Sequence, residues 1–167
     1  MDPPSLPALC VLLLVYGGQA VALSWIDGRE HRLPNRRVGM LTLSTVLALG
    51  LAALIDPALR PLLRVGLVLA VLCAVAGIAL ALVAPQLIGM GDAKTAPVVV
   101  LMTSALGPFS LLAGLLGVAL VGGVAGGLVW AISRRADARF AYGPVLLSAP
   151  FLGLLASPLV AAALGAG

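Results

Sequence analysis

The sequence predicts an all-α membrane protein, a polytopic bundle of about six transmembrane helices. Hydrophobic residues make up 62% of the 167 positions and charged residues only 10%, whereas a soluble domain carries about 25% charged residues. So few charges cannot cover a surface that faces water, so lipid must be the solvent and backbone polar groups must pair inside helices or a closed barrel. The apolar runs are long and lack the period-two alternation of barrel strands, which favours helices.

Six apolar segments follow one another along the chain, and about 20 apolar residues cross about 30 Å of hydrocarbon. The segments are Leu6–Trp25, Val38–Ile55, Leu62–Ala84, Thr95–Leu106, Phe109–Ile132 and Pro144–Leu164. Proline and glycine mark the breaks between them, at Pro57, Pro61, Pro85 and Gly107-Pro108. The fourth segment is short, so we expect it to start below the membrane surface or to be extended by the preceding loop.

The fifth segment is rich in glycine. Gly122 and Gly126 are four residues apart, and so are Gly123 and Gly127. This spacing predicts small faces at which helices approach closely. No internal repeat or soluble linker interrupts the chain, so we expect residues 1–167 to form a single membrane domain.

The basic residues indicate an orientation. Eight of the ten follow the first, third or fifth segment: Arg29, Arg32, Arg36, Arg37, Lys94, Arg134, Arg135 and Arg139. Arg60 and Arg64 alone fall on the other side. The positive-inside rule makes the larger group cytoplasmic and places both termini outside. Because the arginines flank apolar segments, the net charge of +4 reflects topology, and we expect a lipid bilayer and no nucleic acid as partner.

The acidic residues are few, and two of them differ from the rest. Asp56 precedes Pro57 and is expected to cap a turn, while Asp2, Glu30 and Asp137 are expected to be solvated. Asp27 ends the first segment and Asp92 follows the third, which puts both on the cytoplasmic side at similar depth. Carboxylates at a membrane edge are costly and suggest function, although Asp27 alone also suits a helix end that meets water.

Two carboxyl groups at close range cannot both ionise cheaply, so they share a proton. One then deprotonates water while the other donates a proton to the scissile carbonyl, which is the chemistry of an aspartic peptidase and needs no metal. Gly89 and Gly91 permit unusual backbone angles and a close approach of another chain beside Asp92. Cys10 and Cys73 lie in apolar runs and form no zinc spacing or disulfide framework, so no cofactor is expected.

Three motifs together resemble those of the type IV prepilin peptidases, which are GxGD membrane aspartic peptidases. Residues 89–94 (GMGDAK) are similar to the GxGDxK signature, and Asp27 is followed by Leu33-Pro34-Asn35, similar to the second family motif. Tyr142-Gly143-Pro144, after an arginine-rich loop, resembles the family's Phe/Tyr-Gly-Pro before the last helix. The motifs occur in the family order over residues 24–155.

The resemblance implies a bacterial inner-membrane enzyme that removes the basic leader of prepilin-like or pseudopilin substrates at the cytoplasmic face. It implies that Asp27 and Asp92 are catalytic. Gly89, Gly91, Lys94, Pro34 and Asn35 would then bind substrate or support the site. Longer family members carry a cysteine-based zinc motif and also methylate the new N-terminus; this chain has no such cysteines, so we expect the short, peptidase-only form.

Other readings of the same residues stay open. A preflagellin-type GxGD protease would use the same chemistry on another substrate. A small transporter subunit would bind a cation or proton at Asp27 and Asp92, although these lie at one membrane edge and not at the midplane. A non-catalytic scaffold is the third reading. The identity of the substrate, the preference around the scissile bond and the oligomeric state are not indicated by the sequence.

Overall fold

The computed structural model describes residues 4–30, 33–85, 88–133 and 141–165, and these form helices joined by short connections, with no strand among them. The elements are α1 (Leu6–Cys10), the π-helix η1 (Val11–Gly17), α2 (Gly18–Glu30), α3 (Asn35–Ile55), α4 (Leu59–Val83), α5 (Met90–Ala105), α6 (Pro108–Ser133), α7 (Gly143–Leu147) and α8 (Ala149–Ala163). The all-α prediction is therefore confirmed for the described part of the chain.

All six predicted segments are helical, but they differ in length. Four helices in the described ranges are long and apolar enough to cross a membrane: Leu6–Glu30 (α1, η1 and α2 without a break), Asn35–Ile55, Leu59–Val83 and Pro108–Val129. The short fourth segment is extended at its start, because α5 begins at Met90. It still has only 16 residues, and the last segment changes direction at Ser148, between α7 and α8.

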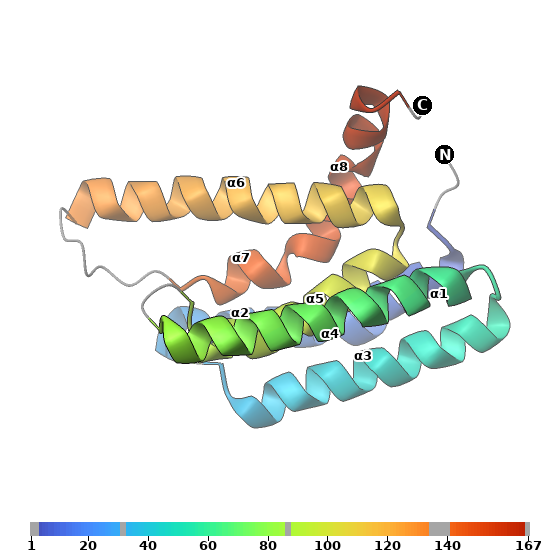
Figure 1. The fold of residues 1–167 in the computed structure, drawn as a ribbon, viewed down its shortest axis with the longest axis horizontal. Coiled ribbons are helices and arrows are strands. Elements are labelled where there is room, and N and C mark those ends of the chain that lie inside the picture. The colour runs from blue at the N-terminus through green and yellow to red at the C-terminus, as the bar shows by residue number, and fades with distance from the viewer. Residues whose placement is uncertain (1–3, 31–32, 86–87, 134–140, 166–167) are drawn as a thin grey trace.

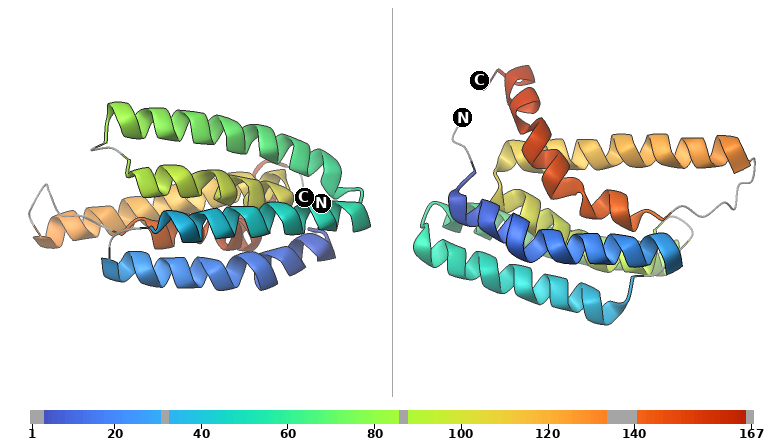
Figure 2. Two further views of the ribbon diagram at one scale, coloured as in Figure 1. Left: turned by 90° about the horizontal axis from the view of Figure 1, so that it is seen from below. Right: turned by 180° about the vertical axis from the view of Figure 1, so that it is seen from behind.

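Successive segments run back and forth along the long axis of the molecule (Figures 1 and 2). At one end, on the left of Figure 1, α2 and α4 finish and α3, α5 and α7 begin; we call this the Asp92 end. At the other end α1 and α4 begin, and we call it the Arg60 end. The α8 helix turns away from the bundle at the Arg60 end, beside the start of α6 (Figure 1).

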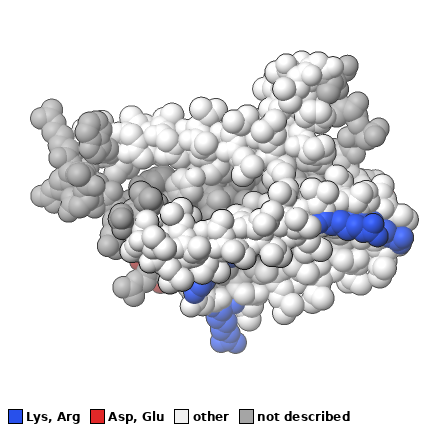
Figure 3. Space-filling view, in the orientation of Figure 1, with Lys and Arg blue, Asp and Glu red and all other residues white. Residues whose placement is uncertain are grey.

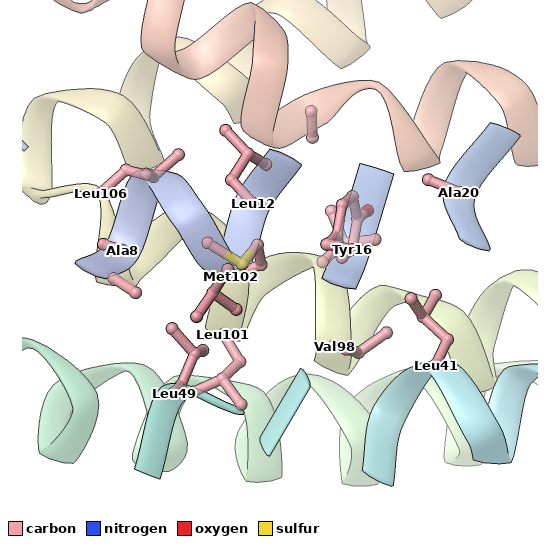
Figure 4. Packing of buried hydrophobic residues seen from close by; sticks show 14 of the residues in the cluster. Ala8, Leu12, Tyr16, Ala20, Leu41, Leu49, Val98, Leu101, Met102 and Leu106 are labelled. Atoms are coloured by element: carbon pink, nitrogen blue, oxygen red, sulfur yellow. The ribbon is translucent and has the colours of Figure 1, made fainter. Parts of the chain in front are cut away.

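The core lies between the first helix, α3 and α5. The side chains in this region form one buried hydrophobic cluster (Figure 4). Its almost fully buried members include Leu12, Tyr16, Leu41, Leu49 and Met102. The hydroxyl groups of α5 are satisfied within the helix, since Thr95 Oγ1 donates to the Gly91 carbonyl at 2.8 Å and Thr103 Oγ1 to the Val99 carbonyl at 2.6 Å. A helix enclosed by others can be shorter and more polar than one facing lipid, and α5 carries Asp92 at its start.

The outer helices present apolar side chains to their surroundings. Large exposed hydrophobic residues run along α3, α4 and α6, among them Leu47, Leu51, Val68, Leu72 and Leu120. An apolar surface of this extent suits a lipid environment. On the face shown in Figure 3, the lysine and arginine side chains form one group at the right-hand end and another at the lower edge, and the surface above and between them is uncharged.

The basic residues of the described ranges divide as expected between the two ends. Arg29, Arg36, Arg37 and Lys94 belong to the last turn of α2 and the first turns of α3 and α5, at the Asp92 end. Arg60 and Arg64 belong to the start of α4, at the opposite end. Arg32, Arg134, Arg135 and Arg139 lie outside the described residues.

The predicted glycine faces of α6 are mostly unused. A Cβ atom added at Gly123, Gly126 or Gly127 would have no neighbour within 4 Å, and at Gly122 it would meet the ring of Tyr142, not another helix. Close contacts between helices occur elsewhere: a Cβ at Gly114 would lie 2.7 Å from the Ala149 carbonyl oxygen, and one at Gly153 would clash with the Ser110 carbonyl oxygen. Glycine spacing alone therefore predicted the wrong part of α6 for helix packing.

Candidate active site

Asp27 lies in the last turn of α2, and its side chain faces the interior. It is only 6% exposed, because Ala20, Leu23 and Asp27 form the buried stripe of that helix. Its Oδ2 atom accepts a hydrogen bond from the backbone N–H of Gly143 at 3.0 Å. A carboxylate at this burial is costly unless it is hydrogen-bonded, and the Gly143 amide provides one such bond.

Gly143 begins α7, where the first backbone N–H groups have no partner within the helix. Asp27 therefore accepts from a donor that the fold would otherwise leave unpaired. The residue must also be small: a Cβ atom at position 143 would lie 2.5 Å from Oδ2 and 2.9 Å from Cγ of Asp27. Glycine alone allows the backbone of α7 to come this close to the carboxyl group.

Asp92 occupies the first turn of α5 and is half-buried. The pKa of Asp92 is raised from 3.8 to about 6, mainly by burial and to a smaller extent by the negative charge of Asp27. This second cause operates only between groups in electrostatic reach of each other. The structure thus brings Asp27 and Asp92 together at one end of the bundle.

Tyr142 forms a further wall of this site. Burial raises the pKa of the Tyr142 phenol, and the charge of Asp92 adds to the effect. The ring also packs on α6, because a Cβ atom at Gly122 would lie 2.6 Å from Cε2 of Tyr142. The phenol therefore stays protonated at neutral pH, and it lies within electrostatic reach of Asp92 and against α6.

Lys94 and Asn35 join α5 to α3 at the edge of the site. The Lys94 ammonium donates a hydrogen bond to Asn35 Oδ1 at 3.2 Å. Pro34 is extended and precedes α3, and its carbonyl oxygen accepts from the N–H groups of Arg37 and Val38. Pro34 and Asn35 thus fix the start of α3, and Asn35 fixes the side chain of Lys94.

The two glycines before Asp92 leave space but adopt ordinary backbone angles. Gly89 has φ −72° and ψ 143°, which any residue can adopt, and a Cβ there would lie 3.5 Å from Asp92 Oδ2. Gly91 is helical, and a Cβ there would lie 3.2 Å from the Leu33 Cβ. Neither glycine uses the unusual backbone angles that it permits, whereas a close approach to Asp92 over Gly89 is sterically open.

A groove starts at Lys94 and runs along α3. It has a volume of about 590 Å³ and is lined by Asn35, Val38, Gly39, Thr42, Leu43, Val46 and Lys94. The lining residues of α3 recur every three or four positions, so they form one apolar stripe of that helix. Its polar head is the Lys94–Asn35 pair, two residues along α5 from Asp92.

The remaining acidic residues are placed elsewhere. Asp56 lies in the turn between α3 and α4, where its Oδ1 accepts from the Ala58 N–H at 3.0 Å, as expected of a turn residue. Glu30 is exposed at the end of α2. Asp2 and Asp137 lie outside the described residues. In the described part of the chain, no group of three or more His, Cys, Asp or Glu side chains could hold a metal ion.

The residues of the site come from four parts of the sequence: the end of α2, the start of α5, the Tyr142-Gly143 step and the start of α3. Sequence reasoning identified Asp27 and Asp92 by topology, but it assigned no contact to Tyr142 or Gly143. Two interacting carboxyl groups, one buried and one half-buried, are equipped for general acid–base catalysis on water. No family model matches the sequence, and no curated protein or solved structure matches it either.

Proposed function

We propose that this protein is a membrane aspartic endopeptidase that removes the basic leader of prepilin-like or pseudopilin substrates. The observation that carries the proposal is that Asp27, at the end of α2, and Asp92, at the start of α5, lie at the same end of an apolar helix bundle, where the charge of Asp27 acts on Asp92. The motif resemblance over residues 89–94, 27–35 and 142–144 supports the same activity from the sequence. The enzyme would be a multi-pass protein of the bacterial inner membrane.

The orientation follows from the charges. If the Asp92 end lies in the cytoplasm, the basic residues at that end obey the positive-inside rule. Asp27 and Asp92, the proposed catalytic dyad, then face the compartment in which a basic leader resides. In this arrangement α5 is the fourth pass and the α7–α8 pair is the sixth, and both are shielded from lipid in part by the longer helices. The number of passes is then six, and both termini are external.

Hydrolysis would require one carboxylate and one carboxylic acid. The carboxylate removes a proton from water as the water oxygen attacks the carbonyl carbon, and the carboxylic acid gives its proton to the carbonyl oxygen. The tetrahedral intermediate then breaks its C–N bond, the new amine takes the proton held by the first aspartate, and one hydroxyl group of the intermediate returns a proton to the second aspartate as the carboxylic acid product forms. Both aspartates return to their starting state, so no further reactant is needed.

The groove headed by Lys94 is the proposed seat of the substrate helix. Its apolar stripe on α3 suits a transmembrane segment, and its ammonium suits an acidic residue near the start of that segment. The resemblance implies such a substrate, with a basic leader that stays in cytoplasmic water. The open space over Gly89 would admit the extended segment around the scissile bond.

The test is to co-express the chain with each pilin-like protein of its own genome and to measure the substrate masses. We expect a loss of mass equal to a leader peptide for one or more of them, and no loss with Asp27→Asn in place of the wild type. A chain that accumulates in the membrane but shortens none of these substrates is not a prepilin peptidase. Cleavage confined to preflagellin-like substrates would support the second GxGD reading.

A further inference from the structure

We infer that the backbone N–H of Gly143 determines which aspartate is the base: Asp27 acts as the general base and Asp92 as the general acid. The inference rests on the proposed peptidase function and deepens it. Two aspartates that share one proton are chemically equivalent unless their surroundings differ. Here the surroundings differ, because Asp27 accepts a hydrogen bond from the backbone N–H of Gly143.

The first difference is the donor. The Gly143 N–H points at Oδ2 of Asp27 at 3.0 Å, inside the protein. A backbone N–H can only donate, so the facing oxygen must offer a lone pair, and a carboxylate oxygen is the stronger acceptor. The bond joins residues that are 116 positions apart, so it exists only when α7 is docked against α2.

The second difference is steric. Any side chain at position 143 would place its Cβ 2.5 Å from the same Oδ2 atom, a distance that real contacts do not reach. The amide can therefore approach the carboxylate only from a glycine. This explains the residue type independently of the hydrogen bond.

The third difference is the setting of Asp92. Asp92 is half-buried in the first turn of α5, and its pKa of about 6 keeps it protonated over the mildly acidic range. The other ionisable groups described around the pair are Tyr142, which stays a neutral phenol, and Lys94, whose ammonium donates to Asn35. Arg29 and Glu30, on α2 itself, are exposed, and so are Arg36 and Arg37 on α3.

The step that follows is balanced. A water O–H bond breaks as its proton moves to the free Asp27 oxygen, and the water oxygen bonds to the scissile carbonyl carbon. The Asp92 carboxylic acid gives its proton to the carbonyl oxygen. When the C–N bond breaks, the nitrogen takes the proton from Asp27, and the diol returns one proton to Asp92 as the carboxylic acid product forms.

The test removes only the N–H. Incorporating glycolic acid in place of Gly143, by suppression of a nonsense codon in cell-free translation, replaces the amide by an ester and adds no side chain. We expect kcat to fall by about tenfold or more with KM unchanged, because the Asp27 carboxylate has lost the charge-assisted bond that orients it as the base. The matched control is the same ester at Gly107, whose N–H donates to the Ser104 carbonyl at 3.1 Å at the far end; it should leave kcat unchanged.

A second readout needs no substrate. Infrared difference spectra against Asp27→Asn in the same backbone isolate the Asp27 carboxylate stretching band, whose frequency should differ between the Gly143 ester and the amide at one pH. An unchanged band frequency or an unchanged kcat would overturn the inference. A shifted band in a protein that cleaves no pilin-like substrate would uphold the Gly143–Asp27 coupling and refute the peptidase function. If the ester protein does not accumulate, Gly143→Ala replaces it, because its Cβ must displace the Asp27 carboxylate. A changed Asp27 band in this variant supports the inference, and an unchanged band overturns it.

Discussion

Asp27 and Asp92 reach the same place by different local means. Asp27 lies on the buried stripe of a long helix whose other face meets lipid, so its carboxyl group is carried inward by helical periodicity. Asp92 lies in the first turn of α5, an enclosed helix. One carboxyl group is therefore fixed by its burial and by Gly143, whereas the other is partly exposed.

Replacing either aspartate should stop cleavage. Asp27→Asn and Asp92→Asn each remove one partner of the shared proton, and acid–base catalysis of this kind is typically worth about 10²–10⁴-fold. Cleavage of a pilin-like substrate in membranes, with protein amount measured by immunoblot, gives the result. Asp56→Asn, which alters only the turn at the far end, should cleave at the wild-type rate. Near-normal cleavage by Asp27→Asn or Asp92→Asn would remove that residue from the mechanism.

The pH dependence should be set by Asp92 on its alkaline side. Asp92 donates a proton only while protonated, and its pKa is about 6. The rate of cleavage should therefore fall as pH rises through about 6, approaching a tenfold loss for each further unit. A rate profile in detergent from pH 4.5 to 8.5 tests this, and a rate that keeps rising to pH 8 would contradict the role.

The same pKa has a consequence for stability. Because the folded-state pKa of Asp92 exceeds the unfolded value of 3.8, the folded state binds its proton more tightly than the unfolded chain does. The contribution of protonated Asp92 to the free energy of unfolding is therefore fully present below about pH 4 and is lost as pH rises through about 6. Asp92→Asn abolishes this dependence. Thermal unfolding of the two proteins at pH 4 and pH 7 should show the wild type losing more stability than the variant over that interval.

Lys94 should act on the substrate through its charge. Lys94→Met keeps the length and apolar bulk of the side chain but removes the ammonium that Asn35 now orients. We expect a clear loss of cleavage of a substrate with an acidic residue at the start of its helix, and a smaller effect when that residue is replaced by glutamine. Equal losses for the two substrates would show that Lys94 supports the structure and does not bind the acidic group.

The sequence was sufficient to pair Asp27 with Asp92 because both lie at helix ends on one side of an alternating topology. It could not assign the contacts of Gly143. That contact depends on how α7 docks onto α2, across 116 positions, and no local pattern encodes the distance between two such segments. The sequence also could not show that Gly89 has an extended backbone that any residue can adopt. A glycine can be present only because it leaves space beside its backbone.

Two elements hold α7 against the first helix. The π-helix η1 carries Tyr16, a fully buried residue whose hydroxyl donates to the Leu147 carbonyl at 3.0 Å. Leu147 ends α7, where helix carbonyls lack partners within the helix. Tyr16 at one end of α7 and Asp27 at the other therefore bind it to the same continuous helix. Short π-helical stretches often occur near functional sites, and this one could not be predicted from an unbroken apolar run.

The α6 helix contacts the ring of Tyr142 at Gly122. Gly122→Ala would place a methyl group 2.6 Å from this ring, so the ring must move. We expect a marked loss of cleavage, of about tenfold or more given the sensitivity of catalysis to misplacement. Gly126→Ala, four residues along, meets nothing within 4 Å and should cleave normally. Equal activity of the two variants would show that the Tyr142 contact does not matter.

In the complete bundle, the longer helices are the more exposed ones and the short helix α5 is the buried one. The long helices α3 and α4 expose large apolar side chains, whereas α5 is short, buried along most of its length and carries the polar residues of the site. The composition of the sequence indicated lipid as the solvent but could not tell which helix is enclosed. That depends on packing, which is why a simple length and hydropathy criterion identifies four candidate spans among the six predicted segments.

The topology provides the last prediction. If all six segments cross the membrane, Ala58, at the Arg60 end, and Leu164, just after α8, lie outside, and Asn35 lies inside. Each position is exposed, so single cysteines can be introduced there after Cys10 and Cys73, both free thiols, are replaced by serine and alanine. A membrane-impermeant maleimide should label Ala58→Cys and Leu164→Cys in intact cells, and Asn35→Cys only after permeabilisation. Labelling of Leu164→Cys only after permeabilisation would show that α7 and α8 return to the cytoplasmic side, and labelling of Asn35→Cys in intact cells would place the dyad outside and end the leader-peptidase reading.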